Sequence, residues 1–376
     1  MPRTLKVLHL CQRDDPSTGG AVQVAGSLVK QFTHLDDVDA RLLFLYGEPG
    51  AFYDRLGERC EYLKLRSSRD VPLYGVRLIR RLSSVDIVHH HDMLAWSNLA
   101  SLVVPGLKRI MHGHVAAGVR NFGWRTKIAN RIQTTHLDRF IAITRDVANS
   151  WADDGVSPSL ITVVNNGIDM DQFSADEAAR IALRREFGFG DSDIVMGFVG
   201  RLHNAMKGVD DFIKTLSYCH QRYKAIIVGE GPDRTSLTQL AAKLGVETRV
   251  RFAGGVIDPH RYYSAMDMFL FTSRFEHFGL APLEAIAAGV PVFSFQCAGG
   301  FNEWASDDLM YRLDSRDCAQ MARLIEETTQ SGTARQTSIR AQSYVRARFD
   351  VSRMADQVAD VYRQLTCGDQ PAAPKE

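Results

Sequence analysis

Two glutamates, Glu276 and Glu284, bracket a predicted helix start in the stretch from residue 268 to 295. An apolar run of strand length opens the stretch, and a glycine-containing loop follows over residues 273–281. Pro282 suits the first turn of a helix, and Gly289 has the permissive backbone needed just past a helix end. We therefore expect one carboxylate in the loop before the helix and one inside the helix.

The helix start between these carboxylates is suited to an anion. The amides of Gly279, Leu280 and Ala281 would point out of the helix without an intrahelical partner, beside the positive end of the helix dipole. Such a terminus favours phosphate, so we expect the neighbouring carboxylates to accept hydrogen bonds from hydroxyl groups. The alternative is that Glu284 only adds favourable charge near the helix start and that Glu276 is a solvated loop residue.

A second charged pair follows an earlier predicted strand, Ile194 to Val199. Arg201 comes directly after the strand, and Lys207 stands at the start of the next predicted helix. A guanidinium offers a bidentate fork and an ammonium offers a point charge, which together suit a departing diphosphate. The alternative is a solvated surface pair.

Together these motifs resemble those of a known enzyme class. Glu276 and Glu284 enclose Phe278-Gly279 and precede Ala288-Gly289-Val290-Pro291, while Arg201 and Lys207 stand in a Gly-Arg-Leu…Lys-Gly pattern. This arrangement resembles the signature of retaining, nucleotide-sugar-dependent glycosyltransferases of the GT-B class, family 4. Two departures are visible: four residues separate Leu202 from Lys207 where three are commoner, and the segment 298–303 lacks a frequent proline.

The resemblance implies specific roles for the residues that match. Glu276 would contact hydroxyls of the transferred sugar, Glu284 would receive the ribose hydroxyls, and Arg201 and Lys207 would hold the phosphates. His112 would lie over the donor sugar and donate to it. The remaining donor-binding positions that it implies are Gly19, Gly20, Val256, Phe278, Gly279, Leu280 and Ala281. For Gly19 and Gly20, an ordinary turn before a helix is the alternative.

Histidines cluster at residues 89–91 and again at His112 and His114, each group at the end of an apolar segment. In an open parallel sheet this is the edge at which ligands bind. Three consecutive histidines on a strand alternate between its faces and cannot all reach one ion. Two Asp-x-Asp motifs, at residues 169–171 and 191–193, lie in linker-like sequence. We therefore expect neither a metal nor another cofactor.

Strand and helix patterns alternate along almost the whole chain, and 376 residues exceed the usual size of one core. The predicted fold class is α/β, a GT-B arrangement of two Rossmann-like doubly wound domains facing across a cleft. The predicted parts are an N-terminal acceptor-side domain (1–172), a nucleotide-sugar-binding domain (173–348), a helix that returns to the first domain (349–368) and a flexible tail (369–376).

The composition shows no strong charge, no metal-binding cysteine pattern and no membrane-spanning run. The formal net charge is +1, and the six cysteines are scattered without metal-binding spacing. No apolar run approaches the length of about 18 residues that a membrane span needs. We expect a cytoplasmic protein with no nucleic-acid partner, and a position at the inner face of the membrane is the alternative.

One segment departs from the balanced charge, because eight basic residues and one acid lie between residues 104 and 145. Arg120, Trp124, Arg125 and Lys127 combine cationic and aromatic character suited to anionic lipid headgroups or a phosphorylated acceptor. The alternative is an amphipathic surface helix packed on the sheet.

The predicted activity is retaining transfer of a sugar from a nucleoside-diphosphate sugar to a glycan, lipid-linked or small-molecule acceptor, as in bacterial-type polysaccharide assembly. A nucleotide-sugar epimerase or hydrolase of the same fold is one rival, and release of free sugar without acceptor would favour it. A non-catalytic nucleotide-sugar-binding protein is another, but it would not need to keep Glu276 or His112.

Overall fold

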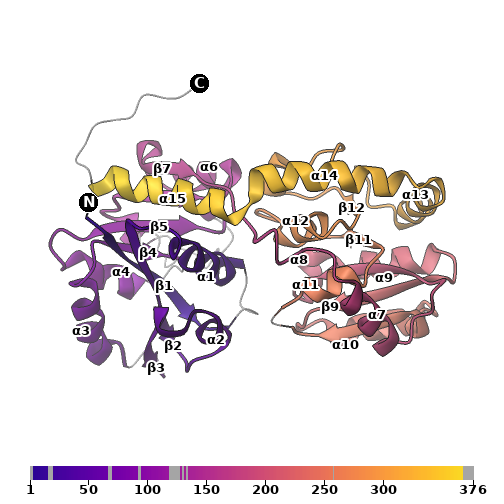
Figure 1. Ribbon diagram of the computed structural model, residues 1–376, viewed down its shortest axis with the longest axis horizontal. Helices are drawn as coiled ribbons and strands as arrows, with labels where there is room; N and C mark the ends of the chain where they lie inside the picture. The colour runs from indigo at the N-terminus through magenta and orange to yellow at the C-terminus, as the bar shows by residue number, and fades with distance from the viewer. Residues whose placement is uncertain are drawn as a thin grey trace. The chain divides into compact units, whose positions relative to one another are not determined.

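A computed structural model of the chain describes residues 3–15, 20–66, 70–91, 95–117, 128, 131–132, 134–256 and 258–366. The chain forms two compact units: unit 1 comprises residues 1–167 and 351–376, and unit 2 comprises residues 168–350 (Figure 1). The sequence placed the first boundary after residue 172. The first and last residues of unit 2 lie side by side. Ile168 forms a β-bridge with Asp350, and the Ile168 N–H donates to Phe349 O at 2.9 Å.

Unit 1 is built on a parallel sheet of order β3-β2-β1-β4-β5-β6-β7. Its strands are β1 (Leu5–Arg13), β2 (Val38–Tyr46), β3 (Cys60–Leu65), β4 (Ile87–His90), β5 (Lys108–Gly113), β6 (Arg139–Ala142) and β7 (Ile161–Val163). Its helices are α1 (Gly20–Phe32), α2 (Ala51–Leu56), α3 (Val71–Leu82), α4 (Ala95–Leu102), α6 (Arg145–Asp153) and α15 (Val351–Thr366).

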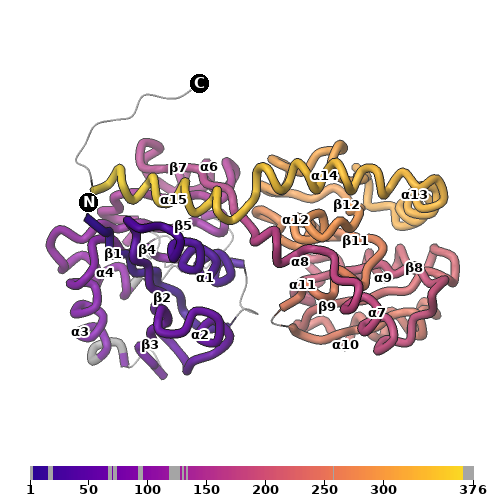
Figure 2. Tube along the Cα trace, in the orientation of Figure 1, coloured from indigo at the N-terminus to yellow at the C-terminus, as the bar shows by residue number. Residues whose placement is uncertain are grey.

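Helix α15 completes the core of unit 1 although it comes from the far end of the chain. Its Met354, Val358 and Tyr362 are buried in the same apolar cluster as Val7 of β1 and Phe32 of α1. Figure 2 shows the yellow C-terminal helix running beside indigo elements from the start of the chain. Outside the cluster, Arg363 donates to both carboxylate oxygens of Asp37 at 2.7 and 3.0 Å.

Unit 2 is built on a second parallel sheet of order β10-β9-β8-β11-β12-β13. Its strands are β8 (Ile194–Val199), β9 (Tyr223–Val228), β10 (Val250–Gly254), β11 (Met268–Phe271), β12 (Val292–Phe295) and β13 (Tyr311–Leu313). Its helices are α7 (Glu177–Glu186), α8 (Asn204–Lys207), α9 (Val209–Tyr218), α10 (Arg234–Lys243), α11 (His260–Ser264), α12 (Leu280–Ala287), α13 (Cys318–Ser331) and α14 (Thr333–Phe349).

The strand order of unit 2 defines where a ligand should bind. From β8 the chain runs through β9 to β10 on one side, and from β11 it runs through β12 to β13 on the other. The loops after β8 and β11 therefore diverge at a topological switch point, where open parallel sheets bind ligands beyond the carboxyl ends of their strands. Arg201 and Lys207 follow β8, and Glu276 follows β11.

Candidate active site

The loops that follow β8, β9 and β10 are tied to one another through their backbones. The Gly200 N–H donates to Val228 O at 3.0 Å, and the Gly229 N–H donates to Gly254 O at 2.8 Å. A Cβ on Gly229 would lie 1.9 Å from Gly200 O, so only glycine permits this approach. Arg201, next to Gly200, is thus presented on a fixed backbone with an exposed side chain, and Val256 is half-buried just past β10.

Asn204 to Lys207 form one helical turn, α8, with His203 as its N-cap, and this turn accounts for the longer spacing noted in the sequence. Gly208 ends this turn in the left-handed conformation, with φ of 60°. A Cβ there would lie 2.3 Å from Thr272 O, at the end of β11. The Thr272 hydroxyl also donates to Lys207 O at 2.8 Å. Lys207 is therefore held directly against the neighbouring strand.

This arrangement brings Lys207 to Glu276. The Lys207 ammonium forms an ion pair with Oε2 of Glu276, and both side chains are about one-fifth exposed, at 23% and 19%. The Glu276 backbone is fixed on both sides, because its N–H donates to Ala298 O at 2.9 Å and its carbonyl accepts from the Phe301 N–H at 3.2 Å. The proline-free segment 298–303 therefore supports the loop that carries Glu276.

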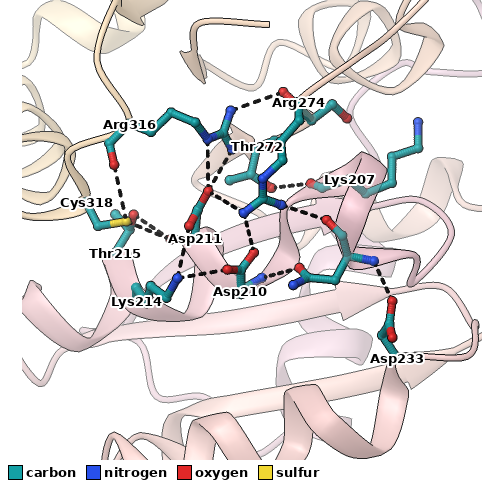
Figure 3. Close-up of polar contacts among 12 residues, drawn as sticks. Lys207, Asp210, Asp211, Lys214, Thr215, Asp233, Thr272, Arg274, Arg316 and Cys318 are labelled. Carbon is teal, nitrogen blue, oxygen red and sulfur yellow. Dashed lines mark hydrogen bonds and ion pairs between the residues drawn. The ribbon is translucent and has the colours of Figure 1, made fainter.

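A buried ion network that was not predicted from the sequence stabilises the Lys207 region (Figure 3). Asp211, 6% exposed, accepts hydrogen bonds from Arg274 at 3.0 Å and from Arg316 at 2.9 Å. The same two guanidiniums donate at 2.6 Å to carbonyl oxygens, Arg274 to Asn204 and Arg316 to Thr272. A buried carboxylate with two guanidinium partners is costly to disrupt, because removing one partner leaves buried charge uncompensated.

The neighbouring carboxylate, Asp210, belongs to the same network. Burial alone would raise its pKa, but hydrogen bonds from Lys214 and Arg274 outweigh burial and lower the pKa below its usual value. An Asp-Asp pair just after the Lys-Gly motif was the available sequence signal. Its arginine partners lie far away in sequence, which hid the pairing.

Helix α12 begins at Leu280, earlier than the sequence suggested. Gly279 is its N-cap with φ of 86°, so the turn into the helix is made there and Leu280 and Ala281 lie in the first turn. Their amides are among those that a helix leaves without an intrahelical partner. The Phe278 ring is buried against Trp304 and Phe349. The ring therefore supports the loop, and the assignment of Phe278 to donor binding stays a prediction.

Glu284 lies inside α12 and is held by a tyrosine. The buried Tyr263 hydroxyl donates to Glu284 Oε2 at 2.7 Å. Burial raises the pKa of Glu284 to about 7, although the Tyr263 hydrogen bond acts in the opposite direction. The protein thus orients one carboxylate oxygen of Glu284. When it is ionised, Glu284 can accept further hydrogen bonds from hydroxyl groups.

Five histidines of unit 1, at positions 9, 89, 91, 112 and 114, contact one another near the carboxyl ends of β4 and β5 and the middle of β1. His112 is buried, and neither of its ring nitrogens has a hydrogen-bond partner among the described residues. Its ring stacks on His89 and His114, with centroids 5.2 and 4.3 Å away. Burial lowers the pKa of His112 well below its ordinary value, so the imidazole is neutral. One member of this cluster, His9, was not predicted from the sequence.

Several predicted positions lie outside the described residues: Gly19, Arg120, Trp124, Arg125, Lys127 and the tail 369–376. Gly20 is described and opens α1 with an exposed backbone. Among the helices that the structure describes, none combines the length and apolar character needed to cross a bilayer.

Two family models match the chain, one in each half. The model "Glycosyltransferase Family 4" matches residues 18–172, and the model "Glycosyl transferases group 1" matches residues 179–343. The chain belongs to glycosyltransferase family 4. The predicted α/β fold with two Rossmann-like domains is confirmed for this glycosyltransferase.

Relatives of this glycosyltransferase have several named activities. The chain is 28% identical to a D-inositol 3-phosphate glycosyltransferase of Salinispora tropica, over 76% of this chain and 65% of the relative. It is 24% identical to a GDP-mannose:cellobiosyl-diphosphopolyprenol alpha-mannosyltransferase of Komagataeibacter xylinus, over 96% and 94%. The crystal structure of Anabaena Alr3699/HepE in complex with UDP and glucose matches with a TM-score of 0.84 and 22% identity, covering 96% and 100%.

Gly208 provides a test of the packing that holds Lys207. Gly208→Ala and Gly188→Ala both introduce a side chain at positive φ, 60° and 71°, which costs roughly 1–2 kcal/mol. Gly188 has open space around it, whereas Gly208 faces Thr272 O. We expect Gly208→Ala to lose clearly more free energy of unfolding in urea denaturation. Equal losses in the two variants would contradict the described packing.

Glu284 provides a pH-dependent test. Folding raises the pKa of Glu284 from 4.5 to about 7. At a pH between these two values, the carboxyl group is protonated in the native state and ionised in the unfolded state. Stability is therefore lost as the pH rises through this window, by about 1–3 kcal/mol for a partly exposed group. Glu284→Gln stays neutral, so it should stabilise the glycosyltransferase relative to wild type at pH 8 but little at pH 4.5.

Urea denaturation at both pH values measures this difference, and Glu247→Gln, at an exposed position, serves as the control. A stability difference between Glu284→Gln and wild type that does not change with pH would refute the raised pKa.

Proposed function

We propose that this glycosyltransferase moves a sugar from a nucleoside-diphosphate sugar to a glycan or lipid-linked acceptor, with retention of the anomeric configuration. The observation that carries the proposal is the Lys207–Glu276 ion pair at the switch point of unit 2. A cation suited to phosphate and a carboxylate suited to sugar hydroxyls meet there. In this proposal the bond between the sugar and the diphosphate lies where these two side chains meet.

We propose that unit 2 binds the donor, with separate groups for its diphosphate, its ribose and its base. Arg201, Lys207 and the first amides of α12 would hold the diphosphate, and Glu284 would accept the ribose hydroxyls. Backbone groups at Val256 would contact the base. The HepE structures with UDP and with UDP-glucose support a nucleotide-sugar donor for this fold. From unit 1, His112 would donate to the sugar, as the family resemblance implies.

In the proposed reaction the bond between the anomeric carbon and the diphosphate oxygen breaks. The acceptor oxygen bonds to the same face of that carbon, and its proton passes to the departing phosphate. Charge accumulates on the leaving diphosphate, so preorganised cations and amides there lower the barrier most. The scheme requires no protein nucleophile on the opposite face of the sugar. A product of inverted configuration, detected by NMR, would refute this part.

The acceptor proposal has separate support. The relative from Komagataeibacter xylinus is named for a diphosphopolyprenol acceptor, and other relatives are named for lipopolysaccharide and O-antigen biosynthesis. We infer that the acceptor is part of a growing polysaccharide or glycoconjugate. Peripheral contact of the basic segment with anionic membrane, at the cytoplasmic face, stays a prediction.

A double-mutant cycle tests whether the Lys207–Glu276 ion pair contributes to transfer. Lys207→Ala and Glu276→Gln should each lower transfer by about tenfold to a hundredfold, since each removes a charge-assisted contact. Because the two groups touch, the double variant should lose less than the product of the single effects. Single-turnover transfer measures the cycle, and Lys243→Ala, at an exposed position in α10, is the neutral control. Strictly multiplicative losses would remove the basis of the proposal.

We further propose that no metal ion assists departure of the diphosphate. Arg201, Lys207 and helix amides can neutralise its charge, so EDTA should leave transfer essentially intact and added Mg²⁺ should change it little. Initial rates before and after chelation provide the measurement. Loss of transfer in EDTA with recovery on adding Mg²⁺ or Mn²⁺ would overturn this proposal.

A further inference from the structure

Three imidazoles of unit 1 converge, and the proposed reaction uses only one of them, His112. His91, His112 and His114 each offer one ring nitrogen, and these three atoms lie within 4.8 Å of one another. His91 Nδ1 and His114 Nε2 are 3.0 Å apart. Two nitrogens bound to a tetrahedral zinc ion at about 2.0–2.1 Å would stand roughly 3.3 Å apart. Small side-chain shifts would therefore suffice to bind an ion.

His112 supplies an independent indication of a missing ligand. It is 2% exposed, and neither nitrogen has a hydrogen-bond partner among the described residues. Buried polar atoms of this kind normally have partners, because leaving them unsatisfied costs free energy. The ring stacks between His89 and His114 and has contact with His91, so its unpaired nitrogens lie within the cluster.

The outer contacts of His91 are compatible with a lone pair on Nδ1, the nitrogen that faces His114. His91 Nε2 is 2.9 Å from His9 Nδ1, and His9 Nε2 is 3.3 Å from the Tyr362 hydroxyl. The Tyr362 oxygen also lies 2.6 Å from His89 Nδ1. If Tyr362 donates to His89, then His9 donates to Tyr362 and His91 donates to His9. In that arrangement Nδ1 of His91 carries a lone pair, and its other nitrogen is anchored as in natural metal sites.

A second trio, His9, His89 and His91, also brings its nitrogens within 4.8 Å. All three of its members are buried, and His9 and His89 already contact the Tyr362 hydroxyl. His114 is half-buried, so the first trio is the more exposed of the two. An ion enters from solvent, so the trio containing His114 is favoured.

We propose that His91, His112 and His114 form a site for one transition-metal ion of the Zn²⁺ class, with the fourth coordination position open. Neutral imidazoles suit zinc, nickel, cobalt and copper, whereas an ion that bridges a diphosphate is a hard Mg²⁺ or Mn²⁺ held by oxygen ligands. The site is therefore chemically different from a diphosphate-bound metal.

A bound metal ion would take the ring nitrogen of His112 as a ligand. In the proposed function this side chain donates to the donor sugar, so on that basis Zn²⁺ would inhibit transfer. Binding itself does not depend on the proposed function, so we test it without substrates.

The experiment titrates metal-free, full-length protein with Zn²⁺ by calorimetry and with Co²⁺ by visible absorption. We expect one ion per chain and the intense bands of tetrahedral Co²⁺. Loss of an outer-shell partner typically weakens binding by about 10–100-fold, so loss of a ligand in His114→Gln should weaken it at least as much. His34→Gln, at an exposed position on unit 1, should bind as wild type does.

His114 is half-buried, so its replacement should leave the fold intact, and circular dichroism verifies this. His91→Gln gives a second ligand variant with the same expected loss. Absence of stoichiometric binding to wild type would overturn the proposal. Binding that stays unchanged in folded His114→Gln would also overturn it, since the ion would then occupy another site. Inhibition by Zn²⁺ is measured separately, so failure of the proposed function would not be mistaken for failure of the metal site.

Discussion

Asp211 lies buried between two guanidiniums, and the loops of the candidate site depend on this contact. Arg274 and Arg316 also reach carbonyl oxygens at the turn before Lys207 and at the end of β11. The network therefore joins the two loops that diverge at the switch point of unit 2. Desolvating these charges is costly, and the cost is offset only in one geometry in which every partner is satisfied.

The consequence for chemistry is preorganisation. Lys207 and Glu276 lie together before any substrate arrives, and glycines at positions 208 and 299 permit the close backbone contacts that hold them. A site that must stabilise charge developing on a leaving group gains most when its charges need no reorganisation. The rigid scaffold and the proposed leaving-group chemistry therefore have the same physical basis.

Much of the fold follows from the sequence because buried parallel strands leave continuous apolar runs. Residues 194–199 were predicted as a strand and form β8, and the apolar run that opens the stretch from residue 268 forms β11. Strand β3 (Cys60–Leu65) was not predicted, because it lies at a sheet edge where only three of its six residues are buried. Asp211 with its arginines and His9 with its histidine partners were missed since their contacts join distant parts of the chain. Periodicity does not report such contacts.

The central claim is that one carboxylate contacts the sugar and the other contacts the ribose. The most direct measurement compares nucleoside-diphosphate affinity with single-turnover transfer in Glu276→Gln and Glu284→Gln. Glu276→Gln should keep its nucleoside-diphosphate affinity while transfer falls by about a hundredfold, because small displacements of the reacting carbon are costly. Glu284→Gln should lose affinity for the nucleoside diphosphate itself. If Glu276→Gln loses the same affinity, or retains full transfer, the account is contradicted.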